Sequence, residues 1–373
     1  MREGWKYKTF GEIGTFLRGK SIQKADFVEH GLPCIHYGQI HTKFGVSVDK
    51  HLSEIPEEVY NKSIIASPGD VVIAITSEDL EGSCKSTAWL GDYDVAVSSH
   101  AAVYKHNLNP KFIAYYLRSN SFFVEKEKYA RGFKVMEIKP TDIARIPIPV
   151  PSGQIQSRIV AELDKINELI QLKKEQLGDY NILAQSLFYD MFGDPAVNDK
   201  NWKVMKLGEI CRNCDNLRKP ITASDRIPGS IPYYGASGIV DYVKDYIFSS
   251  DYLLVSEDGA NLLARTTPIA FSISGKTWVN NHAHVLEFKD SETQLYVEYL
   301  INSVDISNYI TGAVQPKLNQ AKLNVFPIPL PPHSLQQLFA QRIELIEQQK
   351  AEIQSTIQDL ETLLASRMQY WFD

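Results

Sequence analysis

The sequence of 373 residues contains two related copies of one long unit, and this duplication constrains the fold more than any other feature. Trp5-Lys6 returns as Trp202-Lys203, and the segment Ile146–Pro151, with proline at every second position, returns as Phe326–Pro331. The order of the matches is preserved while their offset shrinks from 197 to 180 residues, which indicates a tandem duplication with deletions in the second copy. Sparse identities over so long a unit predict two related domains and not a solenoid of short repeats.

Each copy begins with a Gly-, Pro- and Tyr-rich stretch of short β-type runs. The apolar runs Val71–Ile75 and Tyr252–Val255 predict buried strands. Phe112–Leu117 and Leu295–Leu300 predict short helices packed on these strands. The proline segment that follows cannot continue a ladder, so we expect it to close the sheet. The prediction for each copy is a mixed, β-rich α/β module.

A different pattern follows each module. Residues 152–192 contain no proline, and their apolar residues recur at steps of three and four, near the period of a coiled-coil seam. The same spacing of apolar residues recurs over residues 332–373. About 40 residues of helix extend roughly 60 Å. Ser152 is the predicted N-cap of the first helix, and Ser334 with Gln337 is the predicted capping box of the second.

One amphipathic helix of this length cannot bury its seam against its own small module, whereas two can bury each other. Related copies commonly pack about a two-fold axis, which makes such helices antiparallel. We therefore predict an α/β (α+β) protein, a pseudo-two-fold tandem repeat with two β-rich modules separated by two long antiparallel coiled-coil helices. Helices that merely cover their own sheets are the alternative. The predicted domains are residues 1–151, the helix 152–192, residues 193–331 with a linker over 193–201, and the helix 332–373.

The acidic charge of the chain is concentrated in the two helices. The formal net charge of −6 disfavours a protein whose whole surface binds a polyanion. Residues 152–192 and 332–373 hold −5 of it, so the two modules are nearly neutral. Four cysteines are too few for a disulfide framework, no apolar run reaches the ~20 residues of a membrane span, and the first residues lack a signal-peptide core. We expect a reduced, cytoplasmic protein without membrane association.

Basic side chains in both modules gather in loops that also carry Tyr, Asn, Gln and His. Such loops suit phosphate contact combined with reading of base edges, although an ordinary solvated surface is the alternative for each residue taken singly. In the first module the DNA-binding candidates are Arg18, Lys20, Lys24, Tyr37, Gln39, His41, Lys43, Arg131 and Lys134. In the second module they are Arg218, Lys219, Tyr234, Asn261, Arg265, Asn281, His282 and Lys317.

The string Gly14–Ser21 fits the P-loop pattern letter for letter. A P-loop requires a buried strand before it and a helix after it, so that main-chain amides and the helix dipole hold phosphate. The preceding residues Trp5–Ile13 are too polar for a central parallel strand, and the second copy has lost every motif residue over Cys211–Arg218. A self-contained NTPase or nuclease is therefore the disfavoured alternative.

Other candidate motifs are weaker still. Cys211 and Cys214 have zinc-ligand spacing but no second pair. His282 and His284 could share one strand face, but the first copy keeps only one of them, which favours a packing histidine. Glu137–Lys139 resembles half of a nuclease element without its aspartate, and methyltransferase cofactor and catalytic loops are missing. We predict no catalytic residue, metal or cofactor in this chain.

A duplicated chain of this plan, without a catalytic motif, resembles the specificity subunit of type I restriction-modification systems. Local segments carry the resemblance: Gly14–Lys20, Ile35–Ile40, Arg218–Thr222, Ile231–Ala236, Glu257–Leu262, Val279–His284 and Gln315–Asn319. The resemblance covers essentially the whole chain. It makes the P-loop-like string a loop at the start of a target recognition domain.

The resemblance implies a DNA-recognition subunit that is not itself an enzyme. In that family each recognition domain reads one half of a bipartite, asymmetric target in double-stranded DNA, and the helices set the unspecified spacer and dock modification (methyltransferase) subunits. Those subunits bring S-adenosylmethionine and methylate adenine, while restriction (translocase-nuclease) subunits bring ATP-driven translocation and cleavage. S-adenosylmethionine, ATP and Mg are thus expected on the partners. A non-catalytic coiled-coil adaptor is the remaining alternative, suggested by the helices and their acidic charge.

Overall fold

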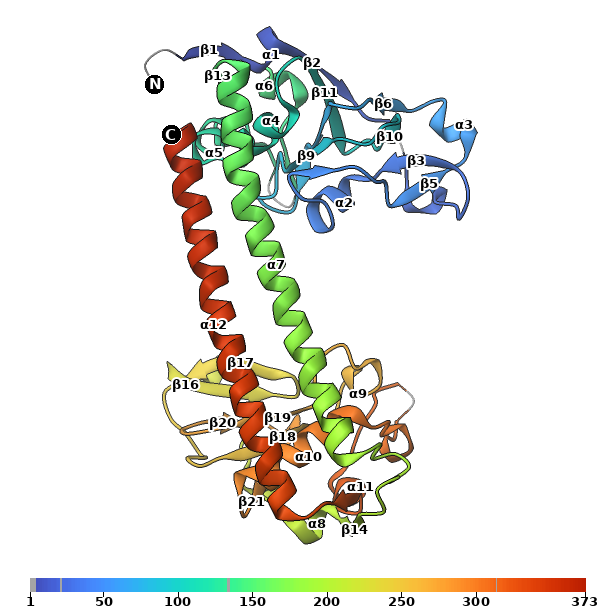
Figure 1. The fold of residues 1–373 in the computed structure, drawn as a ribbon, viewed down its shortest axis with the longest axis vertical. Coiled ribbons are helices and arrows are strands. Elements are labelled where there is room, and N and C mark those ends of the chain that lie inside the picture. Colours follow the sequence, from blue (N-terminus) through green and yellow to red (C-terminus); the bar gives the residue numbers. More distant parts are fainter. Residues whose placement is uncertain (1–4, 21, 133–134, 313) are drawn as a thin grey trace. The chain divides into compact units, whose positions relative to one another are not determined.

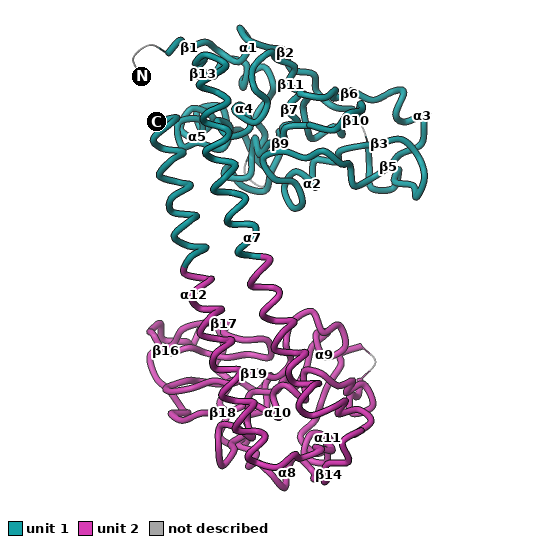
Figure 2. The backbone as a smooth tube through the Cα atoms, viewed as in Figure 1, with its two compact units in different colours: residues 1–174, 356–373 teal, residues 175–355 magenta. Residues whose placement is uncertain are grey.

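The computed structural model describes residues 5–20, 22–132, 135–312 and 314–373. They form two compact units, each of which is considered by itself (Figure 2). Unit 1 comprises Met1–Lys174 and Thr356–Asp373, and unit 2 comprises Glu175–Ser355. The boundary between them cuts through both long helices, so that each unit holds one β-rich module and a part of each helix (Figure 1).

The main sheet of unit 1 has five strands in the order β2-β11-β7-β9-β4. Its middle strand β7 (Val71–Ala74) is fully buried and pairs antiparallel with β11 (Ala101–His106) and β9 (Ser86–Trp89). Helix α4 (Pro110–Tyr116) packs against β7 and β9. The strand predicted over Val71–Ile75 and the helix predicted on it are therefore both observed.

Smaller sheets complete unit 1. A four-stranded sheet has the order β5-β3-β10-β6, in which β3 and β10 run parallel, and the pairs β1-β13 and β12-β8 lie apart from it. The remaining strands of unit 1 are β1 (Lys6–Thr9), β2 (Gly14–Arg18), β3 (Leu32–Ile35), β4 (Ser47–Val48), β5 (Ser53–Ile55), β6 (Ile64–Ala66), β8 (Thr76–Ser77), β10 (Val95–Val97), β12 (Met136–Glu137) and β13 (Pro147–Val150). Its remaining short helices are α1 (Phe10–Ile13), α2 (Tyr37–Thr42), α3 (Glu57–Tyr60), α5 (Asn120–Glu127) and α6 (Pro140–Ile143).

Unit 2 repeats this arrangement with fewer strands. Its main sheet has the order β15-β21-β18-β19, its second sheet the order β17-β16-β20, and β14 pairs with β22. As in unit 1, the second sheet contains one parallel pair, β16 with β20. The strands are β14 (Lys203–Lys206), β15 (Cys211–Asn213), β16 (Pro228–Gly235), β17 (Gly238–Val243), β18 (Tyr252–Ser256), β19 (Ala270–Ile273), β20 (Trp278–Val279), β21 (Ala283–Phe288) and β22 (Pro327–Leu330). The short helices are α8 (Leu207–Ile210), α9 (Asn261–Ala264), α10 (Ser291–Ser303) and α11 (Gln320–Asn324).

The proline segments form strands, which differs from the prediction that they cannot continue a ladder. In unit 1, β13 pairs antiparallel with β1, with Pro147 opposite Thr9 and Pro149 opposite Tyr7. In unit 2, β22 pairs with β14 in the equivalent register. Each pair forms a separate two-stranded sheet, so the proline strand has a second edge that needs no donor. Proline is tolerated on such an edge.

The two long helices are α7 (Gly153–Phe192) and α12 (His333–Phe372). Ser152 caps α7 as predicted, because its Oγ accepts a hydrogen bond from the Ile155 amide at 3.4 Å. The predicted capping box of α12 is wrong, since the helix begins at His333, two residues before the predicted start, and Ser334 lies inside its first turn. There the carbonyl oxygen of Pro332 accepts hydrogen bonds from the amides of Leu335 and Gln336.

Both predicted ways of burying the helices occur. In unit 1, Ile159 and Leu163 of α7 and Phe372 of α12 belong to the core of the β-rich module. Further along, Ile170 and Ile357 are buried but lie outside that core, as expected of a helix–helix seam. The helix ends therefore cover their own module, which was the alternative, while the next turns bury each other.

Within unit 1 the helices run antiparallel. Glu162 of α7 pairs with Arg367 of α12, and Lys174 pairs with Glu361 at 2.9 Å, so the residue numbers rise on one helix and fall on the other. Among the residues that the structure describes, none of the helices is both long and apolar enough to cross a membrane.

Candidate nucleic-acid interface

In unit 1 the chain leaves β3 and turns at once into α2, which positions three of the predicted residues. His36 is the N-cap, and its Nδ1 accepts a hydrogen bond from the Gly38 amide at 3.2 Å. Gln39 completes the capping box, because its Oε1 accepts from the His36 amide at 2.9 Å. The Nε2 of Gln39 donates to Ser53 Oγ at 2.7 Å. The side chain of Gln39 therefore holds the turn, and we no longer propose it as a base reader.

Tyr37 and His41 project from α2 beside His100. The Tyr37 ring centroid lies 4.9 Å from that of His100 and 6.2 Å from that of His41. The Nε2 of His41 lies 3.1 Å from the carbonyl oxygen of Thr76, which makes this nitrogen a donor. A groove of about 1120 Å³ opens here, lined by all three rings together with the loop after β8 and the start of α5.

The groove is lined by both positively and negatively charged side chains. Burial lowers the pKa of Lys126, and its ammonium donates to the carbonyl oxygen of Ser83 at 2.6 Å. Lys85 donates to the carbonyl oxygen of His41 at 2.7 Å. The exposed residues Glu78 and Asp79 also line the groove. This mixture suits the reading of base edges better than it suits a uniform phosphate channel.

The other predicted residues of unit 1 lie in several different places. Lys20 forms a β-bridge with Ser98, whose Oγ accepts from the Tyr37 amide at 2.9 Å, so Lys20 lies next to the Tyr37 turn. Arg18 pairs with Glu137 at 3.0 Å, and Arg131 forms a β-bridge with the same residue. Lys24 and Lys43 are exposed on the η1 turn (Lys24–Asp26) and at the end of α2, and Lys134 lies outside the described residues.

The first five residues of the P-loop-like string form a strand, and its last residue, Ser21, lies outside the described residues. Gly14–Arg18 forms β2, which pairs antiparallel with β11. A Cβ on Gly14 would lie 2.4 Å from the Lys105 carbonyl oxygen, and one on Gly19 would lie 2.1 Å from that of Ser98. The glycines are required by this close strand packing and not by a phosphate. The interpretation of this string as a loop at the start of a recognition domain is therefore wrong for Gly14–Arg18.

In unit 2 the region equivalent to the turn between β3 and α2 lies at the ends of β16 and β20. We call this region the corner of each unit. The amide of Asn280, which follows β20, donates to the carbonyl oxygen of Tyr234 at 3.0 Å. The Oδ1 of Asn280 then accepts from the His282 amide at 2.7 Å. Asn281 and His282 are exposed beside Tyr234. Three predicted residues therefore come together here, and Lys219 is exposed nearby, where its carbonyl oxygen accepts from Trp278 Nε1 at 2.6 Å.

The position of His282 corresponds to that of His100. In unit 1 the His100 carbonyl oxygen accepts from the Ile75 amide at 2.9 Å, and in unit 2 that of His282 accepts from the Glu257 amide at 2.9 Å. The predictions missed His100. The signal that could have found it is the recurrence of histidine in the matching segments Val97–Ala101 and Val279–Ala283.

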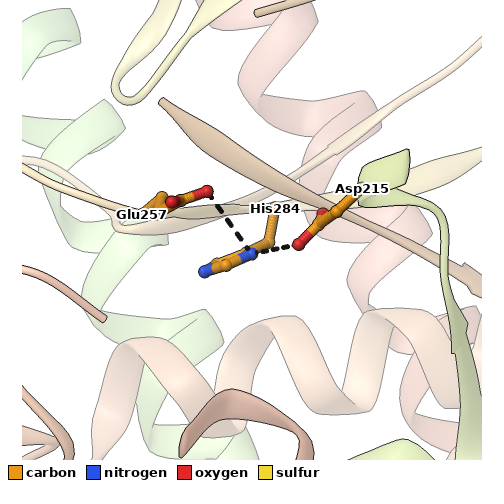
Figure 3. A group of neighbouring side chains, drawn as sticks. All are labelled: Asp215, Glu257 and His284. Atoms are coloured by element: carbon orange, nitrogen blue, oxygen red, sulfur yellow. Dashed lines mark hydrogen bonds and ion pairs between the residues drawn. The ribbon is translucent and has the colours of Figure 1, made fainter. Parts of the chain in front are cut away.

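A buried ion cluster underlies this corner in unit 2 (Figure 3). The His284 side chain is 1% exposed; its Nδ1 lies 2.6 Å from Asp215 and 3.8 Å from Glu257. Its Nε2 lies 2.7 Å from the carbonyl oxygen of Leu318. Both ring nitrogens of His284 therefore face hydrogen-bond acceptors.

Arg218 and Lys317 complete the cluster. The Arg218 guanidinium lies 2.7 Å from Glu257 and 3.5 Å from Asp215, and Lys317 lies 3.1 Å from Glu257. Burial alone would raise the pKa of Asp215, but hydrogen bonds from His284 and the Val285 amide and the charge of Arg218 hold it below its ordinary value. Arg218 and Lys317 likewise outweigh burial and lower the pKa of Glu257.

Oxygen and nitrogen atoms of Asp215, Glu257 and His284 lie within 4.8 Å of one another, as metal ligands would. The chemistry opposes a metal here, because each carboxylate already faces a side-chain cation and both histidine nitrogens face hydrogen-bond acceptors. The arrangement is an ion-pair network.

Cys211 and Cys214, which have zinc-ligand spacing, are both free thiols. Burial raises the pKa of Cys211 to about 12, and its Sγ donates to the Leu207 carbonyl oxygen at 3.3 Å. Among the residues that the structure describes, neither cysteine belongs to a group of three or more potential metal ligands.

Three residues of unit 2 that were predicted to bind DNA form hydrogen bonds or ion pairs within the fold instead. Arg218 has only 12% of its side chain exposed inside the ion cluster. Arg265 has a φ of +50° after α9, and its guanidinium donates to the carbonyl oxygens of Ile301 and Val304 at the end of α10. The Asn261 side chain donates a hydrogen bond to the Thr267 carbonyl oxygen and accepts one from the Thr267 amide. We no longer propose these three as base readers.

A family model for the type I restriction modification DNA specificity domain matches residues 2–178 and again residues 199–362. The putative type I restriction enzyme specificity subunit S.HindORF215P of Haemophilus influenzae is 36% identical over 139 residues, which are 37% of this chain and 35% of the relative. The EcoKI specificity subunit of Escherichia coli is 25% identical over 173 residues, 44% of this chain and 37% of the relative. The matched regions span less than two thirds of either relative.

Solved structures show the same fold. The type I restriction-modification S subunit from M. genitalium aligns with a TM-score of 0.57 at 14% identity, over 100% of this chain and 98% of that chain. A chain from a structure concerning complex assembly and conformational transition of the type I R-M system aligns with a TM-score of 0.63 at 17% identity, over 99% and 97%. At these identities the likeness concerns the fold alone.

Proposed function

The chain belongs to the family of type I restriction-modification DNA specificity proteins, and on this premise we propose that it selects the DNA target of such a system. Each β-rich module reads one half of a bipartite, asymmetric target in double-stranded DNA. We place the two recognition domains at residues 1–151 and 193–331, and the spacer helices at 152–192 and 332–373.

The observation that supports this proposal best is that the same corner of the same fold carries different side chains in the two units. Unit 1 presents Tyr37, His41 and His100 there. Unit 2 presents Tyr234 with Asn281 and His282. Because donors and acceptors differ while the framework is kept, the two modules would select different base pairs, which makes the target asymmetric.

The proposed division of labour places all catalysis on other subunits. Modification subunits would dock on the acidic helices and bring S-adenosylmethionine for adenine methylation, and restriction subunits would bring ATP, Mg and DNA cleavage. Two recognition domains joined by one spacer gain effective concentration when both half-sites stand at the right distance. The negative helices would avoid the duplex between the half-sites. The proposed location is the cytoplasm.

The direct test is methylation-site sequencing of cells that express this chain with its modification subunit. We expect one bipartite adenine-methylated motif with an unspecified spacer, and none in cells that lack only this chain. Methylation that is unaltered by removal of the chain would contradict the proposal. Unchanged methylation together with retained binding of the modification subunit would instead favour the coiled-coil adaptor.

The helices should set the spacer of that motif. We expect insertion of seven residues into both α7 (after Lys174) and α12 (after Ser355) to lengthen the spacer by about 3 base pairs. Seven residues add roughly 10 Å of helix while nearly preserving the face of the seam, and a base pair rises about 3.4 Å. The spacer length is read by methylation-site sequencing.

The control for this prediction inserts the same seven residues into the linker 193–201, outside both helices. That variant should keep the original spacer. A spacer that stays the same after insertion into both helices, in a complex that still methylates DNA, would refute a ruler function for α7 and α12.

A further inference from the structure

An exposed histidine at the corner of unit 2 is paired with a carboxylate that is largely buried. The Nδ1 of His282 lies 3.0 and 2.9 Å from the two carboxylate oxygens of Asp258. The side chain of His282 is 48% exposed, whereas that of Asp258 is only 16% exposed. Within the described part of the chain, the other ring nitrogen of His282, Nε2, has no hydrogen-bond partner. The pair therefore leaves Nε2 available to a ligand.

The main chain of His282 is held as firmly as its ring. Its amide donates to Asn280 Oδ1 at 2.7 Å, and its carbonyl oxygen accepts from the Glu257 amide at 2.9 Å. Glu257 directly precedes Asp258, so the chain that leaves β18 holds both the main chain and the ring of the histidine. A side chain that is already fixed loses little conformational freedom when it binds a ligand.

The carboxylate of Asp258 determines which hydrogen bonds Nε2 can form. A carboxylate only accepts hydrogen bonds, so the neutral imidazole of His282 carries its hydrogen on Nδ1 and its acceptor lone pair on Nε2. In the major groove adenine and cytosine present an exocyclic amine that donates, whereas guanine and thymine present acceptors. An exposed Nε2 of this kind therefore matches adenine or cytosine and is unfavourable beside the acceptors of guanine or thymine.

The charges around the pair favour a base edge over a phosphate as its ligand. Asp258 itself would repel a phosphate. The neighbouring Glu257 faces Arg218 at 2.7 Å and Lys317 at 3.1 Å, so both of these cations are already matched by a carboxylate. The exposed Lys219 is the nearby cation that remains for the DNA backbone. Phosphate contacts would position the module, and the histidine would select the base.

Unit 1 has the histidine of this pair but not the carboxylate. The matching main-chain hydrogen bond joins the His100 carbonyl oxygen to the Ile75 amide, which places Thr76 where unit 2 has Asp258. Thr76 is buried, and a hydroxyl both donates and accepts, so it does not select one form of the imidazole. Among the described residues of unit 1, no carboxylate forms an ion pair with His100, whose ring instead lies 4.9 Å from that of Tyr37.

We infer that Asp258 and His282 form a reading pair, in which Asp258 orients the imidazole and Nε2 of His282 accepts a hydrogen bond from the exocyclic amine of one adenine or cytosine. This inference rests on the proposed function and names one specificity-determining contact within it. His282 is the base-reading residue, and Asp258 is a positioning residue. Because unit 1 lacks the carboxylate, this contact belongs to the half-site of unit 2 alone.

The test uses the complex of this chain with its modification subunits and the target duplex that methylation-site sequencing identifies. The half-site of unit 2 is the one that changes when residues 193–331 are exchanged. Fluorescence anisotropy measures the affinity for the target, for duplexes with one base pair of this half-site changed at a time, and for an unrelated duplex. Two kinds of base analogue separate the possible contacts, because one lacks only the exocyclic amine and the other lacks only the purine N7.

Four variants separate the reading residue from its support. His282→Ala removes the ring, Asp258→Asn removes the charge at nearly the same size, and Asp258→Glu keeps a carboxylate. Asp290→Asn is the matched control, because Asp290 also pairs with a histidine, His333 at 3.3 Å, but lies beyond the other end of β21. Asparagine still caps the helix there, as Asn109 caps α4 in unit 1. Urea denaturation checks that each variant is folded.

We expect the wild-type complex to lose affinity about 10- to 100-fold at one adenine or cytosine of this half-site, both when the base pair is changed and when only its amine is removed. In His282→Ala and Asp258→Asn this discrimination should fall about 10-fold at that position and stay unchanged elsewhere. Asp258→Glu should retain more of it than Asp258→Asn, and Asp290→Asn should retain all of it.

Each other outcome contradicts a definite part of the inference. Full discrimination at every position in His282→Ala would refute the reading pair, and full discrimination in Asp258→Asn alone would refute the positioning role. An equal change of affinity for all duplexes in Asp258→Asn would mean that the carboxylate acts only through its charge. A loss caused by removal of N7 and not of the amine would mean that His282 donates. A wild-type complex that prefers no duplex would instead refute the proposed function.

Discussion

Replacing His284 by alanine is expected to lower the free energy of unfolding by about 3–5 kcal/mol, one of the two largest effects predicted for this chain. His284 is 1% exposed, and its two ring nitrogens face Asp215 and the Leu318 carbonyl oxygen. Without it, Asp215 keeps its buried negative charge but loses its shortest partner, at 2.6 Å. Urea denaturation of the purified chain, followed by circular dichroism, measures the loss.

His282→Ala is the matched control. His282 has 48% of its side chain exposed and pairs with Asp258 at 2.9 Å, so its removal should change the free energy of unfolding by about 1 kcal/mol or less. If the two substitutions have equal effects, the cluster around His284 is not an interdependent buried network.

The same cluster predicts a loss of stability in acid. The pKa values of Asp215 and Glu257 are held below their ordinary values in the folded chain. The unfolded chain therefore binds more protons near pH 4, and the stability that these carboxylates contribute is present above that pH and is lost as the pH falls further. In Asp215→Asn the part of the pH dependence that belongs to Asp215 should disappear from the denaturation curves.

Exchanging residues 1–151 for the recognition domain of another type I specificity subunit is expected to change one half of the methylated motif and leave the other half intact. Each base contact contributes about 1–3 kcal/mol of discrimination between base pairs. The loss of several contacts made by the replaced module should therefore abolish recognition of the old half-site almost completely. The second module and both helices are unchanged, and the partners should still assemble. Methylation-site sequencing of cells that carry the hybrid reads the result.

The design of this exchange must respect the core of unit 1. Ile159 and Leu163 of α7 and Phe372 of α12 pack directly into the module that is replaced. The donor should therefore present an equivalent apolar surface, which a thermal melt of the hybrid checks. The reciprocal exchange of residues 193–331 should change the other half of the motif. A hybrid that folds but changes both halves would disprove the modular interpretation.

Features that repeat along the chain could be predicted from the sequence. The helix expected over residues 152–192 is observed as α7 (Gly153–Phe192), because its periodicity is a local property of the chain. The strands β7 and β18 are observed where apolar runs predicted them. The beginning of α12 was missed because two side chains with capping propensity do not reveal which residue leaves the helical conformation.

The candidate site could be predicted only in part. Tyr37 and His41 lie in one groove, and Asn280, next to Asn281 and His282, bonds to the main chain of Tyr234, so the mixed basic and polar loops predicted residues that the fold brings close together. The same composition could not separate Lys219, which is exposed, from Arg218, which is bound in a buried cluster. A side chain that bonds to a residue about 40 positions away leaves no local pattern.

The sequence by itself determined that this protein is a tandem repeat of two β-rich modules with two long helices, because duplication and periodicity are visible along the chain. Only the tertiary structure decided which charges are available at the corner that we propose to read DNA. In unit 2, Asp215, in the turn after β15, pairs with His284 at 2.6 Å, whereas in unit 1 Arg18 of β2 stands opposite Ala102. Oppositely charged side chains that are far apart in the sequence neutralise each other where the fold brings them together. The tertiary contacts, and not the composition, therefore set the charge that each module presents.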